Sequence, residues 1–284
     1  MIIGNLFGGL GNQMFQYAFV RCLSIEKNEN FAFTIDMIYF YRKNNIYELK
    51  KAFNLDLNIL NEKQINFKSF YFLKYPLIRF IFSKIKVNIF SFYFEKHISI
   101  KQKFYFNKNS DTKIFYGYWQ NEDYFTKYRS IILNDFRFHI SSDELNTQIY
   151  NLIKSKNSVS IHIRRGDYKN SKSHNCLNLE YYLKAIEHLK SMYKNIYFFV
   201  FSDDIQWVKN NLDENNFIVI DNNQKNPYID MYLMSQCNHN IIANSSFSWW
   251  AAWLNTNEQK KIIAPRKWYN NKKIQPIPTN WVLI

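Results

Sequence analysis

The chain has 284 residues, of which 47% are apolar and 19% aromatic, and its formal net charge is +14. This length accommodates one large α/β domain or two domains of ordinary size with a substantial core. Three widely spaced cysteines without a CxxC pair argue against a disulfide framework and a cysteine zinc site, and fit a reducing cytoplasm. The N-terminus lacks a signal-peptide pattern and the sequence holds no apolar run of about 18 residues, so we expect a cytoplasmic protein without a membrane-spanning helix.

The N-terminal segment opens like a Rossmann unit. Residues 2–6 are apolar and predict a strand, glycines follow at positions 8, 9 and 11, and apolar residues then recur at helical spacing from Met14 to Leu23. Glycines let a backbone approach a ligand, and the start of a helix presents N–H groups to an anion. The loop matches neither GxGxxG nor a P-loop, so a tight turn between strand and helix is the alternative interpretation.

Residues 61–110 are rich in aromatic residues and lysine and form an insert of different character. They are compatible with one or two amphipathic helices that have a basic face. Such a face either lies on an anionic membrane surface or consists of solvated lysines on helices packed against the core.

Strands and helices alternate in the second half. Strands are expected at residues 158–163, 196–201, 217–220, 241–243 and 262–264, and helices after Asn178 and at residues 205–212, 228–237 and 246–253. This order predicts a parallel sheet with helices on both faces. A polar stretch near residues 150–157 predicts a boundary between an N-terminal domain, 1–155, and a C-terminal domain, 156–284.

Polar clusters follow three of the predicted strands: Arg164-Arg165, Asp203-Asp204 and Asn244-Ser245-Ser246. Ligands of such sheets bind at the carboxyl ends of the strands, where these clusters meet. The guanidinium fork suits a phosphate, and side chains of adjacent strand residues point to opposite faces. One arginine is therefore expected to hold a phosphate while the other pairs with a carboxylate such as Asp167. The alternative interpretation is that the arginines form a purely structural salt bridge and bind no phosphate.

The remaining polar residues favour an anion site without a metal. Asn244, Ser245 and Ser246 are expected to cap the next helix, whose N–H groups then face a diphosphate. Asp203 is either a site residue or a helix cap. No Asp-x-Asp occurs in the chain and the histidines lack metal-ligand spacing, so no metal or other cofactor is expected.

Four motifs together resemble the α1,2-fucosyltransferases of glycosyltransferase family 11. They are residues 8–18 (Gly-Gly-Leu-Gly-Asn-Gln-Met-Phe-Gln-Tyr-Ala), 162–168 (His-Ile-Arg-Arg-Gly-Asp-Tyr), 201–204 (Phe-Ser-Asp-Asp) and 242–250 (Ile-Ala-Asn-Ser-Ser-Phe-Ser-Trp-Trp). The resemblance spans nearly the whole chain except the insert. It implies a GT-B-type α/β fold with two Rossmann-like domains. The N-terminal domain, which includes the insert at residues 61–110, would be the acceptor side, and the donor site would lie in the C-terminal domain, facing the interdomain cleft. It also implies inverting, metal-independent transfer of L-fucose from GDP-β-L-fucose to the hydroxyl of a terminal galactose on a surface glycan such as lipopolysaccharide.

The resemblance also implies roles for single residues. Arg165 would hold the β-phosphate with Arg164 in support, and Asn12 would lie near the fucose beside Gly11. The other implied ligands of the nucleotide are His162 and Asp230 at the guanine, Asp203, and Ser245 and Ser246 at the phosphates.

The general base does not transfer from the more distant α1,6-fucosyltransferases. Their proposed base, a glutamate five residues after the motif's aspartate, corresponds to Lys172 here. Asp167 is our candidate base, and a partner that orients an arginine is its alternative role. Four other functions stay open: a fucosyltransferase of different linkage, a transferase of another GDP-sugar and, from different classes, a basic nucleic-acid-binding protein and a non-catalytic glycan-binding module. Peripheral contact with an anionic membrane is a further expectation.

Overall fold

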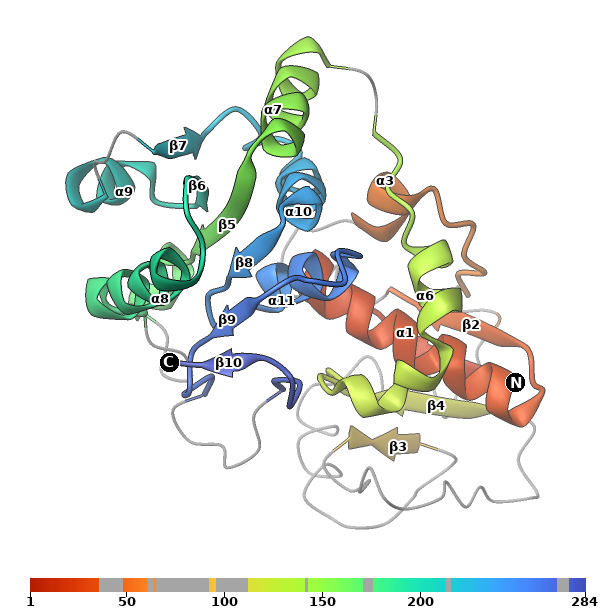
Figure 1. Ribbon diagram of the computed structural model, residues 1–284. Helices are drawn as coiled ribbons and strands as arrows, with labels where there is room; N and C mark the ends of the chain where they lie inside the picture. Colours follow the sequence, from red (N-terminus) through yellow and green to blue (C-terminus); the bar gives the residue numbers. More distant parts are fainter. Residues whose placement is uncertain are drawn as a thin grey trace. The chain divides into compact units, whose positions relative to one another are not determined.

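A computed structural model of the protein describes residues 1–35, 48–60, 64, 92–95, 112–140, 143–170, 176–212, 216–269 and 276–284. The chain divides into two compact units, Met1–His139 and Ile140–Ile284 (Figure 1). Each unit is built on one parallel β-sheet. The predicted α/β class with two Rossmann-like units is therefore confirmed.

The first unit has a four-stranded parallel sheet in the order β2-β1-β4-β3. Its strands are β1 (Ile2–Asn5), β2 (Phe31–Thr34), β3 (Phe92–Phe94) and β4 (Lys113–Tyr116). Its described helices include α1 (Leu10–Lys27), α3 (Glu48–Phe53) and α6 (Arg129–Asp135), and two 3-10 turns, Glu122–Tyr124 and Thr126–Tyr128, precede α6. The strand order reverses beside β1, because β1 leads to β2 on one side while β4 lies on the other.

Aromatic side chains make up much of the interior of this unit. Phe19 of α1 stacks on Trp119 with ring centroids 3.9 Å apart, and Tyr17 stacks on Phe33 of β2. Phe19 and Trp119 are buried. The high aromatic content of the sequence therefore has a packing role here, since large rings remove much apolar surface from water.

The second unit has a six-stranded parallel sheet in the order β10-β9-β8-β5-β6-β7. Its strands are β5 (Asn157–Ile163), β6 (Ile196–Ser202), β7 (Phe217–Ile220), β8 (His239–Ile241), β9 (Ile262–Ala264) and β10 (Val282–Leu283). Its helices include α7 (Glu144–Ser155), α8 (Leu179–Met192), α9 (Ile205–Asn211), α10 (Pro227–Gln236) and α11 (Ser246–Leu254).

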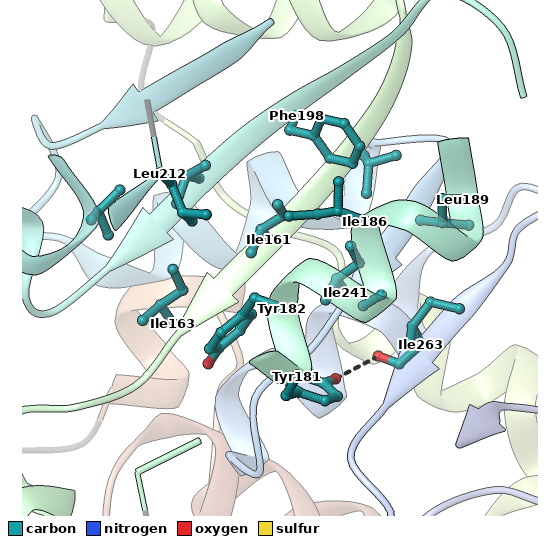
Figure 2. Close-up of a cluster of buried hydrophobic side chains, with 14 of the residues drawn as sticks. Ile161, Ile163, Tyr181, Tyr182, Ile186, Leu189, Phe198, Leu212, Ile241 and Ile263 are labelled. Atoms are coloured by element: carbon teal, nitrogen blue, oxygen red, sulfur yellow. Dashed lines mark hydrogen bonds between the residues drawn. The ribbon is translucent and has the colours of Figure 1, made fainter. Parts of the chain in front are cut away.

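The two faces of this second sheet carry different helices. Figure 2 shows the core on one face, where Ile161 and Ile163 of β5 pack with Tyr182 and Ile186 of α8. The hydroxyl of Tyr181 donates to the carbonyls of Ile242 (2.6 Å) and Ile263 (3.3 Å), which ties α8 to the ends of β8 and β9. Helix α10 packs against both α7 and α11, and the β5 side chains that alternate with this core face these helices.

Most elements predicted for the second half are confirmed within one residue at each end. The exception is β8, which was expected at residues 241–243 and lies at His239–Ile241. The polar residue Asn240 interrupts the apolar pattern by which this strand would be recognised in the sequence. Its amide is fully buried and donates to Ser160 Oγ (2.7 Å) and the Met234 carbonyl (2.8 Å), and a buried polar side chain with such partners is compatible with a central strand.

The predicted domain boundary after residue 155 lies 16 residues later than the division of the structure after His139. Helix α7 accounts for the difference, because it packs within the second unit. Asn146 of α7 exchanges side-chain hydrogen bonds with Asn223 (2.9 and 3.0 Å), and Lys154 donates to the carbonyl of Gln236 (3.1 Å).

The predicted helices of the insert lie outside the described residues, which in this segment are Gln64 and residues 92–95. Strand β3 belongs to that described part and pairs with β4. In the described ranges, no helix combines the length and the apolar character that a bilayer crossing requires.

Candidate functional site

The strand order of the second sheet reverses between β5 and β8. From β5 the chain moves outward through β6 and β7, and it then returns to place β8 on the other side of β5. Ligands of such sheets bind where the order reverses, beyond the carboxyl ends of the strands. The Arg164-Arg165 pair follows β5 here, and Asn244 and Ser245 follow β8. The structure therefore brings together two polar clusters that are about 80 residues apart in the sequence.

Successive side chains of β5 point to opposite faces of the sheet, and this alternation separates the two arginines that follow the strand. His162, on the face of α10 and α11, lies with its ring 5.5 Å from that of Phe247 in α11. Ile163 points to the opposite face, into the α8 core. The loop after the strand continues this pattern, so Arg164 and Arg165 lie on different sides of the sheet edge.

Arg164 lies on the side of α11 and is held by two carboxylates. Its Nε and Nη2 donate to Asp167 Oδ1 at 3.0 and 2.8 Å, and its Nη1 lies 3.1 Å from Asp203 Oδ2. Its guanidinium carbon is 5.7 Å from the centre of the Tyr168 ring, and the Tyr168 hydroxyl donates to the Asn244 carbonyl (3.1 Å). Arg164 is thus a positive charge, one-third exposed, that is linked through Tyr168 to the residue before the serine cap of α11.

Arg165 lies on the side of α9. Its guanidinium carbon is 4.3 Å from the centre of the Trp207 ring, and its Nε donates to Asp204 Oδ2 at 3.2 Å. Lys169 Nζ lies 2.8 Å from the same oxygen. The Lys169 ammonium, with smaller contributions from the Trp207 N–H and Arg165, holds the pKa of Asp204 below its ordinary value. Arg165 is therefore part of an ion-pair and ring cluster around the start of α9.

Asp203 fixes the backbone between the two arginines. Its two carboxylate oxygens accept hydrogen bonds from the backbone N–H groups of Arg165 (2.8 Å) and Gly166 (3.1 Å). A Cβ at position 166 would lie 2.7 Å from Asp203 Oδ2, so a side chain here would push the Asp203 carboxylate out of this position. The sequence left Asp203 open as a helix cap or a site residue. In the structure it holds the arginine loop, and the cap of α9 is its neighbour Asp204, which accepts from Trp207 N (3.3 Å).

Helix α11 begins at this edge with a serine cap, as predicted. Ser245 has an extended backbone, and its hydroxyl accepts from Phe247 N (3.4 Å). Ser246 is the first helical residue, and the first turn carries no acidic side chain. Its N–H groups and the positive end of the helix dipole therefore favour an anion here. Trp249 and Trp250 are fully buried, so both have a packing role.

His162 is buried and electrically neutral near pH 7. Burial, together with the adjacent Arg164 charge, lowers its pKa to about 3. Its Nδ1 is buried and has no hydrogen-bond partner among the residues the structure describes. A neutral imidazole with one unused nitrogen can donate to or accept from a ligand atom but carries no charge for a phosphate.

Asp230 lies in the first turn of α10, at the end of a buried amide network. Asn223 donates to its Oδ1 (2.8 Å) and pairs in turn with Asn146 of α7. Burial raises the pKa of Asp230 to about 7, and the Asn223 hydrogen bond opposes this shift. A carboxyl group that titrates near neutral pH at this edge can act as donor or acceptor towards a heterocycle.

Gly11 and Asn12, the remaining candidates, lie in the first turn of α1 in the first unit. Gly11 is buried in the helix. Asn12 Oδ1 accepts from Gln120 Nε2 (2.8 Å), a residue that follows β4. The structure therefore groups these two candidates with the first sheet. Lys172 lies outside the described residues.

Sequence reasoning assigned no individual role to four residues at this edge of the second sheet: Tyr168, Lys169, Asp204 and Trp207. The aromatic residue directly after the Arg-Gly-Asp run and the tryptophan three residues after Asp204 were the available signals. Within the described ranges, no cluster of three or more histidine, cysteine or acidic side chains is arranged to hold a metal ion.

A cavity of about 260 Å³ lies away from these residues, at the amino-terminal edge of the same sheet. Its lining comes from the C-terminal ends of α7, α10 and α11 and includes Lys154, Gln236, Asn238 and Asn257. No predicted site residue lines it.

The parallel sheets and the paired basic and helix-terminus groups define an α/β protein equipped for an anionic ligand. The family model of glycosyl transferase family 11 matches residues 3–284. The chain belongs to this family, and it is a glycosyltransferase.

Similar proteins support this membership along the whole chain. The protein is 35% identical to an alpha-1,2-colitosyltransferase of Escherichia coli over 299 aligned residues, covering 100% of this chain and 99% of the relative. It is 34% identical to the O-antigen biosynthesis glycosyltransferase WbnK of Escherichia coli, with 98% of each chain covered. A galactoside alpha-(1,2)-fucosyltransferase 1 of Ateles belzebuth is 30% identical over 103 residues, 34% of this chain and 28% of that protein.

Solved structures show the same fold. The NodZ alpha-1,6-fucosyltransferase soaked with GDP-fucose has a TM-score of 0.56 and 14% identity, with 89% of this chain and 91% of that chain covered. Fucosyltransferase NodZ from Bradyrhizobium has a TM-score of 0.57 and 13% identity, with 88% and 91% covered. At this identity the likeness supports the fold of the chain, which is the fold class expected from its sequence.

Proposed function

We propose that this glycosyltransferase moves L-fucose from GDP-β-L-fucose to a hydroxyl of a terminal galactose, with inversion to an α1,2 linkage, on a bacterial surface glycan. Family membership and the names of the bacterial and animal relatives support this assignment. The observation that carries it is the position of Arg164 at the reversal of strand order, linked through Tyr168 to the serine-capped start of α11.

In this reaction the acceptor oxygen forms a bond to the anomeric carbon of the donor sugar. The bond from that carbon to the diphosphate breaks, GDP leaves with the electron pair, and the hydroxyl proton passes to a base or to solvent. Negative charge therefore grows on the diphosphate. Arg164 and the N–H groups at the start of α11 are placed to stabilise it, and losing one such contact typically costs about 100-fold or more in rate.

The geometry favours Arg164 over Arg165 as the phosphate ligand, the reverse of the roles that the family resemblance implies. Arg164 lies on the α11 side, whereas Arg165 contacts Asp204 and Trp207 on the α9 side. Asp167 accepts two hydrogen bonds from Arg164, so we assign it the orienting role that the sequence left open. His162 and Asp230 remain the proposed contacts to guanine.

A second donor, GDP-colitose, is favoured by one observation, because the full-length relative at 35% identity is named a colitosyltransferase. Colitose is L-fucose without the 3-hydroxyl group. A site that hydrogen-bonds this hydroxyl rejects the deoxy sugar strongly, whereas a site that leaves it unbound discriminates by only a small factor. The ratio of kcat/KM for the two donors therefore decides between the assignments.

The test is incubation of the purified chain with GDP-fucose or GDP-colitose and a panel of galactosides, with and without EDTA, followed by linkage analysis. We expect α1,2-linked product at an unchanged rate in EDTA. Absence of transfer from both donors, or activity that EDTA abolishes, contradicts the proposal. Steeply salt-dependent binding of nucleic acid without affinity for GDP is the result expected of the rival, nucleic-acid-binding function.

A further inference from the structure

The register of the second sheet aligns three isoleucines on neighbouring strands. Ile161 of β5 pairs with Ile241 of β8, and Ile241 pairs with Ile263 of β9. All three belong to the core that packs against α8. The residues three positions further along the three segments are Arg164, Asn244 and Arg266. The segment that leads from β8 into α11 is therefore flanked by an arginine from the strand on each side.

The backbone after β9 stays extended as far as Arg266. The N–H of Ile284 donates to the Ala264 carbonyl (3.0 Å), and the N–H of Arg266 donates to the Ile284 carbonyl (2.9 Å). These two hydrogen bonds continue the parallel ladder between β9 and β10 beyond the ends of the strands. Because side chains alternate along such a backbone and Ile263 faces α8, Arg266 lies on the α11 side of the sheet. Arg164 lies on this same side.

Asn244 joins the two segments that carry these arginines. Its carbonyl accepts from the Tyr168 hydroxyl (3.1 Å), and its Nδ2 donates to the Trp268 carbonyl (3.3 Å). Tyr168 belongs to the loop of Arg164, and Trp268 stands two positions after Arg266. Asn244 is buried, so these hydrogen bonds are shielded from water and hold the three segments firmly. The start of α11 is thus fixed to both neighbouring loops.

The two arginines differ in the carboxylates around them. Arg164 is held by Asp167 and Asp203. Arg266 is exposed, and within the described ranges no carboxylate lies at ion-pair distance from it. The sequence gives the reason, because residues 259–284 contain six lysines and arginines and no aspartate or glutamate. A guanidinium without a counter-ion beside the start of a helix raises the positive potential there and favours an anion.

The spacing of the two arginines suits an anion with two charged groups. Neighbouring strands lie about 4.8 Å apart, so β5 and β9, which flank β8, are separated by about 10 Å. Each guanidinium can bind one phosphate group through two parallel N–H groups. A diphosphate above the start of α11 then offers one phosphate group to Arg164 and the other to Arg266, whereas a single phosphate group engages one of them.

We infer that Arg266 is a second arginine ligand of the donor's diphosphate, and that Arg164 and Arg266 hold it from opposite sides of the serine-capped start of α11. When the sugar leaves the donor, negative charge grows on the diphosphate, and a second preorganised cation stabilises that charge. The inference rests on the proposed function only in naming the anion as the diphosphate of a sugar donor. Binding of a diphosphate at this edge does not depend on which sugar is transferred.

The experiment compares three variants of the full chain with the wild type. Arg266→Ala removes the guanidinium, and Arg266→Lys keeps a positive charge without the planar fork. Lys267→Ala is the matched control, because it removes the adjacent exposed cation and changes the net charge equally. Affinities for GDP, inorganic pyrophosphate and guanosine are measured by calorimetry, and urea unfolding verifies that each variant is folded. Where transfer is observed, kcat and the donor KM are also determined.

We expect Arg266→Ala to weaken binding of GDP and pyrophosphate by about tenfold or more, because a charge-assisted hydrogen-bond pair is lost. Guanosine, which has no phosphate, should bind all variants equally. Arg266→Lys should lie between Arg266→Ala and the wild type, and Lys267→Ala should bind GDP nearly as the wild type does.

Three results overturn the inference: wild-type protein that binds neither GDP nor pyrophosphate, an Arg266→Ala variant that binds GDP as tightly as the wild type, and an equal loss of GDP affinity in Lys267→Ala. Pyrophosphate binding that depends on Arg266 in a protein without GDP-sugar transfer keeps the diphosphate site and rejects the proposed function. Transfer at the wild-type rate by Arg266→Ala does the reverse.

Discussion

Replacing each of the two adjacent arginines by alanine separates their roles. Arg164→Ala removes the guanidinium on the α11 side, where we place the diphosphate. Loss of one preorganised contact of this kind lowers the rate by about 100-fold or more, equivalent to about 2.7 kcal/mol of transition-state stabilisation. Arg164 and its partner Asp167 are 33% and 44% exposed, so solvent screens the pair and the free energy of unfolding should fall by less than about 1 kcal/mol.

Arg165→Ala should lower the folding stability more, and the GDP affinity less, than Arg164→Ala does. The side chain is 19% exposed and packs 4.3 Å from the Trp207 ring centre, a contact that contributes about 1 kcal/mol to folding stability. Its backbone N–H stays bonded to Asp203 in the variant, because that hydrogen bond involves no side-chain atom of Arg165. We expect a clear loss of stability with a smaller loss of GDP affinity than in Arg164→Ala.

The assay combines calorimetric titration with GDP, transfer kinetics and urea unfolding of both variants and the wild type. Arg165→Lys serves as a matched control, because it keeps a positive charge but not the planar fork. The reasoning is refuted if Arg165→Ala, correctly folded, loses more GDP affinity than Arg164→Ala. Equal effects of the two variants would also contradict the division of roles.

Further predictions concern the backbone clamp and two titrating groups. Gly166→Ala places a Cβ 2.7 Å from Asp203 Oδ2 and should weaken GDP binding at least tenfold. The control variant Gly9→Ala, whose Cβ meets nothing within 4 Å, should leave GDP binding unchanged. Equal GDP affinities of the two variants would contradict the role of Asp203 in holding the arginine loop. The pKa of His162 is lowered to about 3, so the unfolded chain binds more protons between about pH 3 and 6.5 and stability falls as pH drops through that window. Urea unfolding at pH 7 and pH 5 should therefore show a loss about 2 kcal/mol larger for wild type than for His162→Asn, and identical pH slopes would disprove it. The pKa of Asp230 is raised to about 7, so stability falls as pH rises from about 4 to 7, and Asp230→Asn should be more stable than wild type at pH 8 but not at pH 4; the same difference at both pH values would speak against the shift.

The sequence predicted the second unit much better than the first. Strands such as 217–220 and 262–264 stand out because short apolar runs are separated by polar, turn-forming residues. In the first unit the predicted strand at residues 2–6 and the helix that follows it are confirmed, whereas β2, β3 and β4 were missed. These strands have only three or four residues, too few for a periodic pattern to stand out.

The arrangement of the residues in the candidate sites was likewise only partly predictable from the sequence. Alternation along β5 already indicated that Arg164 and Arg165 point to opposite faces. It did not indicate which face carries the serine-capped helix, because that depends on the side on which the chain returns from β7 to β8. The pairing of Phe7 with Tyr118, 111 positions apart, likewise depends on the register of β1 and β4.

By itself, then, the sequence determined the order of elements in the second unit, the chemistry of the groups at the strand ends and the family resemblance, because these depend on local periodicity and on residue type. Only the tertiary structure decided that Arg164 is linked to the start of α11, that Trp207 and Asp204 hold Arg165, and that the rings of Phe7, Tyr116 and Tyr118 meet at the edge of the first sheet. These features arise when distant segments pair and cross over in a particular order, and no local pattern of residues encodes that order.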